Sequence, residues 1–148
     1  MVHVSCFEDR VPNKWKRQWD QIRFGHYKLL LTEPLISEIF YMLESEYGRD
    51  EAKTYILRLK SLRSTKISTD RDQYAFLSAH LKHKYRKYNL SMIDSFILAL
   101  GKIEKAQICT TDHGLRDAAK EERCNISFLP IESIETRERA VESYTNRG

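Results

Sequence analysis

The segment from Leu90 to Leu129 constrains the fold of this 148-residue chain more than any other. Ser91 can cap a helix, and Asp94 three residues later is the partner that a capping box needs. Apolar side chains then recur at helical spacing at Ile93, Phe96, Ile97 and Leu100. We therefore predict a buried helix that runs to about Glu104.

Two short apolar runs follow this helix, at residues 106–109 and 125–129. Each is typical of a buried strand in a parallel sheet. Asp112 then stands just beyond the carboxyl end of the first of these strands, and Asp94 lies in the first turn of the preceding helix. Ligands of open α/β sheets bind at that edge, so both carboxylates are candidate site residues.

The rest of the chain repeats the alternation of strands and helices. Short strands are predicted at 28–31 and 66–68, and further helices at 13–25, 34–47, 50–62 and 70–88. Such alternation predicts an α/β fold, a three-layer α/β/α sandwich around a central, mainly parallel sheet. At this length we expect one domain, residues 1–148, with 131–148 as a C-terminal helical tail.

Composition excludes several classes of protein. Hydrophobic residues make up 41% and charged residues 31% of the chain, which is ordinary for a globular protein. There is no apolar run near the roughly 20 residues of a membrane span and no signal-peptide pattern, so we expect no membrane partner and a cytoplasmic location. The three cysteines form no Cys-x-x-Cys pair, which favours free thiols. A net charge of +4 permits a polyanionic partner without requiring one.

A third acid, Glu38, lies between the apolar positions of the helix predicted at 34–47. Each acid has a structural explanation when it is taken alone. Asp94 completes a capping box, Asp112 caps a helix, and Glu38 is stabilised by the helix dipole. Their conjunction at one edge of a parallel sheet is what points to a site.

Three motifs together resemble the PIN domain, a fold of metal-dependent nucleases that includes the VapC-type toxins. They are Leu-Ser-x-x-Asp-x-x-Ile-Leu-Ala from Leu90, Thr-Thr-Asp-His from Thr110, and Leu-Ile-Ser-Glu-Ile from Leu35. The resemblance covers about Lys28 to Pro130. It implies a ribonuclease in which Glu38, Asp94 and Asp112 hold Mg²⁺ or Mn²⁺.

The resemblance also implies supporting residues and partners. Thr110 and Thr111 would hold the carboxylates or a water molecule by hydrogen bonds, although a strand-end hydroxyl that caps the next helix explains them equally well. Family members are often homodimers, and toxin members pair with an antitoxin protein.

One part of the family pattern is missing. A PIN domain begins with an apolar strand that ends in an aspartate, whereas Val2 to Phe7 can form a strand but no such aspartate follows it. We expect either that the aspartate precedes Met1 in a longer chain, or that its loss weakens catalysis. Asp9 is a candidate substitute.

The helix predicted at 70–88 carries a basic cluster near its end. Lys84, Arg86 and Lys87 alternate there with Tyr85 and Tyr88. Such a cluster suits phosphate contact and base stacking in single-stranded nucleic acid, and we interpret it as a candidate substrate surface. A solvated helix face is the alternative.

The leading functional hypothesis is therefore a divalent-metal-dependent endoribonuclease. The first alternative is a catalytically impaired PIN-like module that binds RNA or protein and lacks the first acidic ligand. A receiver-like acidic pocket for phosphoryl transfer ranks lower, because the chain has neither a pair of adjacent acids after its first strand nor a matching lysine.

Overall fold

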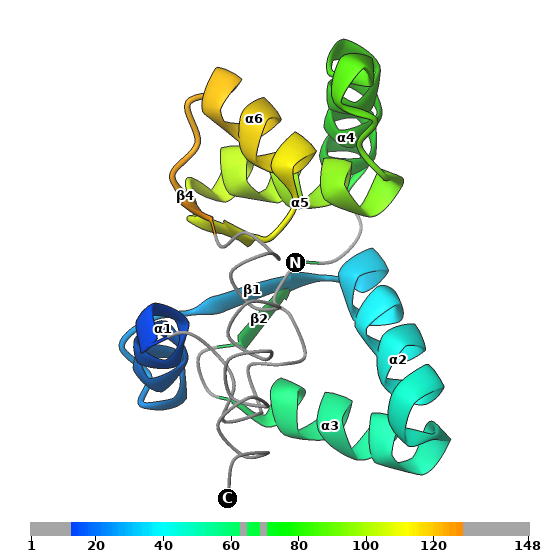
Figure 1. Cartoon of the computed structure of the whole chain (residues 1–148), viewed down its shortest axis with the longest axis vertical. Helices are drawn as coiled ribbons and strands as arrows, with labels where there is room; N and C mark the ends of the chain where they lie inside the picture. The colour runs from blue at the N-terminus through cyan, green and yellow to red at the C-terminus, as the bar shows by residue number, and fades with distance from the viewer. Residues whose placement is uncertain (1–12, 63–64, 69–70, 129–148) are drawn as a thin grey trace, which may run out of the picture.

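A computed structural model of the chain describes residues 13–62, 65–68 and 71–128. Figure 1 shows two pairs of strands with helices packed around them. The elements in chain order are α1 (Asn13–Arg23), β1 (Leu29–Thr32), α2 (Glu33–Tyr47), α3 (Arg49–Ser61), β2 (Thr65–Ser68), α4 (Asp72–Lys84), the 3₁₀ helix η2 (Arg86–Tyr88), α5 (Met92–Glu104), β3 (Ile108–Thr110), α6 (His113–Glu121) and β4 (Ile126–Phe128). The strand proposed at 2–7, Asp9 and the tail at 131–148 lie outside the described residues.

Both pairs of strands are parallel. β1 pairs with β2, with Leu31 opposite Ile67, and β3 pairs with β4, with Cys109 opposite Ser127. Parallel pairing requires a crossover between the strands, and helices supply it in each case. The predicted parallel α/β fold is confirmed, although the described strands are short and form two separate pairs.

Local sequence sets the ends of α2. The Thr32 side chain accepts a hydrogen bond from the Leu35 amide at 3.3 Å, and Pro34 stands in the first turn, where a missing N–H costs nothing. Gly48 ends the helix with a φ of 85°, a left-handed value that favours glycine. These signals place Glu38 just after the first turn of α2.

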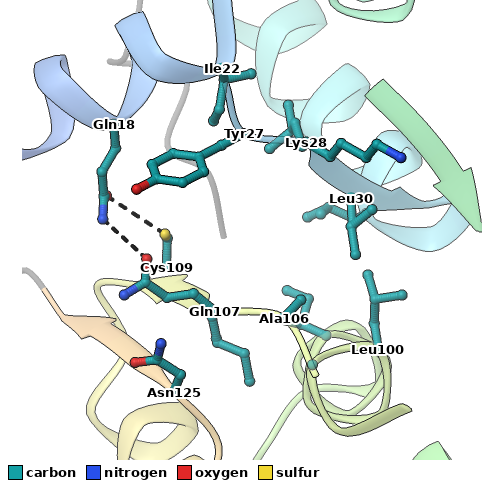
Figure 2. A pocket seen from close by; sticks show the side chains of 15 residues that line it. Gln18, Ile22, Tyr27, Lys28, Leu30, Leu100, Ala106, Gln107, Cys109 and Asn125 are labelled. Atoms are coloured by element: carbon teal, nitrogen blue, oxygen red, sulfur yellow. Dashed lines mark hydrogen bonds between the residues drawn. The ribbon is translucent and has the colours of Figure 1, made fainter. Parts of the chain in front are cut away.

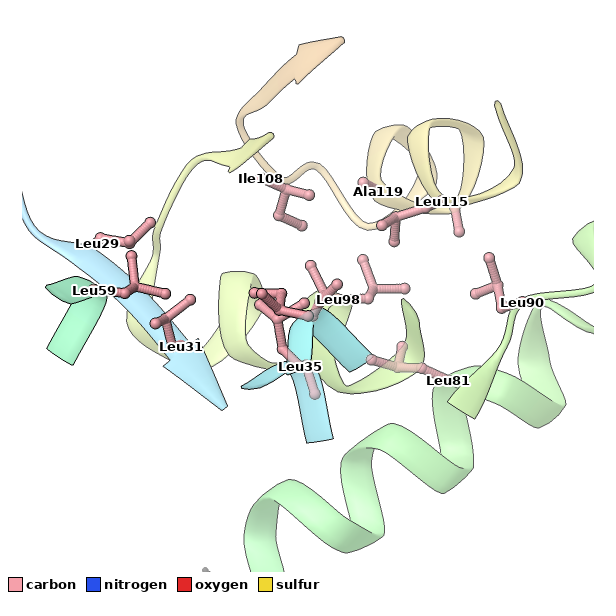
Figure 3. Close-up of a cluster of buried hydrophobic side chains, with 14 of the residues drawn as sticks. Leu29, Leu31, Leu35, Leu59, Leu81, Leu90, Leu98, Ile108, Leu115 and Ala119 are labelled. Atoms are coloured by element: carbon pink, nitrogen blue, oxygen red, sulfur yellow. The ribbon is translucent and has the colours of Figure 1, made fainter. Parts of the chain in front are cut away.

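The helix α5 is the centre of the hydrophobic core. It packs against α2, α4 and α6 and contacts a strand of each pair, β1 and β3. Leu98 on α5 has no exposed surface, and neither have Leu31 on β1 and Leu115 on α6, which lie in the same cluster (Figure 3). Burial of this apolar stripe fixes the position of the α5 N-terminus, which carries Asp94.

A cavity of about 470 Å³ lies between the two pairs of strands. Leu30 and Leu100 face it from β1 and α5, and Cys109 faces it from β3 (Figure 2). Gln18 on α1 spans its rim and donates a hydrogen bond to Gln107 at 3.2 Å. The lining is mainly apolar, but it includes exposed residues such as Tyr27 and Gln107, so the cavity is open to the surface.

Within residues 13–62, 65–68 and 71–128, no helix combines the length and the apolar character that a membrane span requires.

Candidate functional site

Glu38 and Asp94 come from different helices and influence each other electrostatically. Glu38 is half-buried on α2, between the buried residues Leu35 and Ile39. Burial raises the pKa of the Glu38 carboxyl above its usual value, and the negative charge of Asp94 raises it further. The contact between α2 and α5 therefore places Glu38 within electrostatic reach of Asp94.

A capping box at the start of α5 holds the Asp94 carboxylate. Asp94 Oδ2 accepts hydrogen bonds from the Ser91 amide at 3.0 Å and from the Ser91 hydroxyl at 2.7 Å, and the Asp94 amide donates to Ser91 Oγ at 3.0 Å. No hydrogen bond to Asp94 Oδ1 is present within the described part of the chain. The predicted capping role is confirmed, and one carboxylate oxygen remains for a ligand.

Asp112 caps α6, as the structural explanation predicted. Its Oδ1 accepts a hydrogen bond from the Leu115 amide at 2.6 Å, and its own amide donates to the Thr110 hydroxyl at 3.0 Å. The residue is exposed, whereas Thr110 and Thr111 are buried. Thr110 thus positions the backbone of Asp112 and does not bond its carboxylate.

The meeting of all three acids around one ion stays a prediction. Glu38 and Asp94 interact, and Asp112 follows β3 at the carboxyl end of the strand. Among the described residues, no group of three His, Cys, Asp or Glu side chains is arranged so that it could hold a metal ion.

The chemistry of Glu38 and Asp94 nevertheless suits a divalent cation. Both supply only carboxylate oxygen, the ligand that Mg²⁺ and Mn²⁺ prefer. The raised pKa of Glu38 reflects partial burial and repulsion that a cation would relieve. Because Mg²⁺ needs only one or two carboxylates besides water and substrate phosphate, this pair fits such an ion.

The basic cluster at the end of α4 is largely engaged with α6. Lys84 pairs with Glu122 at 2.6 Å, and Lys87 pairs with Glu121 at 2.9 Å. Arg86 is exposed, and no carboxylate among the described residues pairs with it. Of the three predicted basic substrate residues, only Arg86 is therefore without a carboxylate partner in the structure.

The two tyrosines of this cluster also face α6. Tyr85 is buried, and its hydroxyl donates to Glu122 Oε1 at 2.5 Å. The hydroxyl of Tyr88 donates to Glu121. Their hydroxyl groups tie α4 and η2 to α6. The Tyr85 ring is buried and therefore not open for stacking, whereas Tyr88 is half-buried and its stacking role stays a prediction.

Glu122 is a structural residue that sequence reasoning missed. Its side chain is only 3% exposed, and it accepts hydrogen bonds from Lys102 on α5, from Lys84 on α4 and from Tyr85. Burial alone would raise the pKa of Glu122, but these donors outweigh burial and lower it to about 2. We call these four side chains the Glu122 cluster. Its members lie 20 to 38 residues from Glu122, so no local motif indicated them.

Comparisons with known proteins give one match. The family profile described as PIN domain matches residues 2–121 of the chain. No curated protein and no solved structure matches it.

Proposed function

The chain belongs to the PIN-domain family, and on that basis we propose that it is a divalent-metal-dependent ribonuclease that hydrolyses RNA phosphodiester bonds. The observation that best supports this proposal is the electrostatic pairing of Glu38 with Asp94. Burial raises the pKa of the Glu38 carboxyl, and the charge of Asp94 on another helix raises it further. A cation-binding role explains why a fold would retain that repulsion.

In the proposed site, Glu38 and Asp94 would hold the ion, and Asp112 stays the predicted third ligand. When bound, Mg²⁺ or Mn²⁺ would supply Lewis-acid stabilisation of the negative charge that develops on the phosphate. The protein side chains position this chemistry. Ser91 fixes the Asp94 carboxylate, and Thr110 fixes the backbone of Asp112.

The reaction needs no nucleophilic side chain. A water oxygen forms the new bond to phosphorus, and the bond from phosphorus to the leaving ribose oxygen breaks. A carboxylate would orient that water and accept its proton as the new bond to phosphorus forms, and solvent would protonate the leaving oxygen.

The second candidate function is a catalytically impaired PIN-like module that binds RNA or protein. It is favoured by one observation, the lack of a three-ligand group among the described residues. Under either function, three further points remain predictions: that the chain is related to VapC-type toxins, that it has an antitoxin partner, and that it forms a homodimer.

RNA cleavage by the purified chain, with Mn²⁺ and with a chelator, tests the two candidates. We expect cleavage only with the metal, and we expect Asp94→Asn to reduce it by at least about 100-fold, because the charge of a metal ligand is lost. Asparagine keeps an oxygen that can accept the Ser91 hydrogen bonds, so the start of α5 is preserved.

A matched control is Asp72→Asn, which removes an exposed acid from the first turn of α4. It should cleave like the parent chain. If the parent shows no metal-dependent cleavage, or if Asp94→Asn cleaves as well as Asp72→Asn, the nuclease proposal is wrong and the binding module is favoured.

A further inference from the structure

The helix α4 presents two basic surfaces with different surroundings. Lys84 faces α6 and is paired with Glu122. On another side of the helix, Lys82 and His83 line a groove of about 390 Å³, together with Arg86 of η2. No aspartate or glutamate is among the described residues that line this groove, so its positive charge is not neutralised locally.

The groove borders the start of α5, the helix that carries Asp94. Its far wall includes Leu90 and Met92, and Met92 is in the first turn of α5. The Lys82 ammonium group donates a hydrogen bond to the Leu90 carbonyl and so connects the two walls.

The exposed side chain of Phe76 lies on the same face of α4 as the groove residues Ala79 and His83, towards the start of the helix. Phe76 is 72% exposed, although it belongs to a helix that buries Tyr74 and Leu81. Residues three and four apart share a helix face, so Phe76, Ala79 and His83 form one line along α4. At the other end, Met92 is 49% exposed and adds apolar surface.

From this arrangement we propose that the groove holds the backbone of single-stranded RNA. Arg86 would contact a phosphate, and the Phe76 ring would stack on a base. Unpaired basic groups beside an exposed aromatic ring are the combination with which proteins bind single strands without reading their sequence. The proposal rests on the proposed ribonuclease function, because RNA is the substrate proposed there.

The charge of the groove favours this occupant over an apolar peptide. Arginine binds phosphate through a planar fork of donors, and Arg86 has no carboxylate partner in the described part of the chain to compete for that fork. Lys84 and Lys87, which were predicted on the same substrate surface, are paired with Glu122 and Glu121, so a phosphate can reach Arg86 without displacing a carboxylate.

Binding of a short, fluorescently labelled oligouridylate tests the proposal. Anisotropy is measured on the full chain in chelator, where cleavage does not interfere, over a series of KCl concentrations. Arg86→Gln should weaken binding by about threefold to tenfold and reduce the salt slope by about 0.7, the value for one phosphate contact on a single strand. Arg86→Lys should keep the salt slope.

The proposed stacking of Phe76 on a base should affect the affinity but not its dependence on salt concentration. Phe76→Ala should weaken binding by at least about fivefold while leaving the salt slope unchanged, because stacking releases no counterions. Matched controls come from the exposed face of α3, where Arg58→Gln removes an exposed arginine and Leu57→Ala removes an apolar side chain that is 67% exposed.

The outcomes separate this inference from the proposed function. If Arg86→Gln binds like Arg58→Gln, or Phe76→Ala like Leu57→Ala, or if the parent chain does not bind the oligouridylate, the groove proposal is overturned even when Mn²⁺-dependent cleavage is observed. Binding that depends on Arg86 and Phe76 without any cleavage would support the groove and overturn the nuclease.

Discussion

Glu38 on α2 and Asp94 on α5 lie close enough for the charge of Asp94 to raise the pKa of the Glu38 carboxyl, in addition to the effect of burial. At neutral pH, burial of the Glu38 carboxylate and its repulsion by Asp94 lower the stability of the folded chain. A site that binds cations is expected to carry such a cost, since function and stability often oppose each other.

Glu38→Gln should therefore stabilise the metal-free protein. A carboxyl whose folded-state pKa is raised binds more protons in the folded than in the unfolded state, so stability falls as pH rises through the usual pKa towards the raised one. Glutamine removes this loss, and we expect a gain of about 0.5 kcal/mol at pH 7, because the site is partly exposed. Thermal unfolding in chelator at pH 7 and at pH 4 measures the gain. It should shrink at pH 4, where the glutamate is largely protonated, and a destabilised variant at pH 7 would contradict the prediction.

Divalent metal should raise the thermal stability of the parent chain. A ligand that binds only the folded state stabilises it by about 2.7 kcal/mol at 100 times its dissociation constant. Melting temperatures with increasing Mn²⁺ should rise for the parent and for Asp72→Asn, but not for Asp94→Asn. Equal shifts in all three proteins would mean that the ion binds elsewhere.

Removing the buried carboxylate of the Glu122 cluster should destabilise the fold strongly. Glu122→Ala leaves Lys84, Lys102 and Tyr85 without their common acceptor, and a loss of about 2–3 kcal/mol is expected from the charged hydrogen bonds. Urea unfolding measures this loss. The control is the neighbouring Glu121→Ala, whose side chain is 41% exposed and which should change stability by less than about 1 kcal/mol.

The same cluster predicts an acid-sensitive fold. Because the pKa of Glu122 is lowered to about 2, its contribution is fully present above the ordinary glutamate pKa and is lost as pH falls from about 4.5 to about 2. Unfolding free energies across this interval should fall more steeply for the parent chain than for Glu122→Gln. Parallel curves would show that the cluster does not set acid stability.

Gly114→Ala should destabilise the protein, although alanine is the better helix former. A Cβ at this position in α6 would lie 2.6 Å from the carbonyl oxygen of Tyr88, a backbone atom that cannot move alone. We expect a net cost of about 1–3 kcal/mol from the steric conflict. Urea unfolding should show this cost, with Lys120→Ala on an exposed position of α6 as the comparison. A stabilised Gly114→Ala would mean that α6 and η2 are not in this close contact.

Local sequence signals predicted most of the secondary structure. The Ser91 and Asp94 capping box and the apolar spacing after it located α5, because both act within one or two helical turns. The four strands predicted within the described residues each agree with the observed one to within about two residues, which is the usual uncertainty at element ends. The helix predicted at 70–88 is interrupted at Tyr85, where the backbone leaves the helical region before η2.

Local sequence signals could not indicate interactions between distant segments of the chain. The electrostatic contact of Glu38 with Asp94 was anticipated from the shared sheet edge together with the resemblance to the PIN domain. The pairing of Lys84 with Glu122 joins residues 38 positions apart, and nothing in either local sequence indicates it. The basic cluster was consequently assigned as one surface, whereas packing of α6 divides it into a bonded face and an open groove.

The Glu122 cluster has a consequence for how related sequences can diverge. A single buried acid serves donors from α4 and α5, so neither Lys84 nor Lys102 can be replaced by an apolar residue without weakening the compensation of that charge. A descendant that loses both lysines should therefore also have exchanged the buried acid, whereas the half-exposed lysines can persist without it.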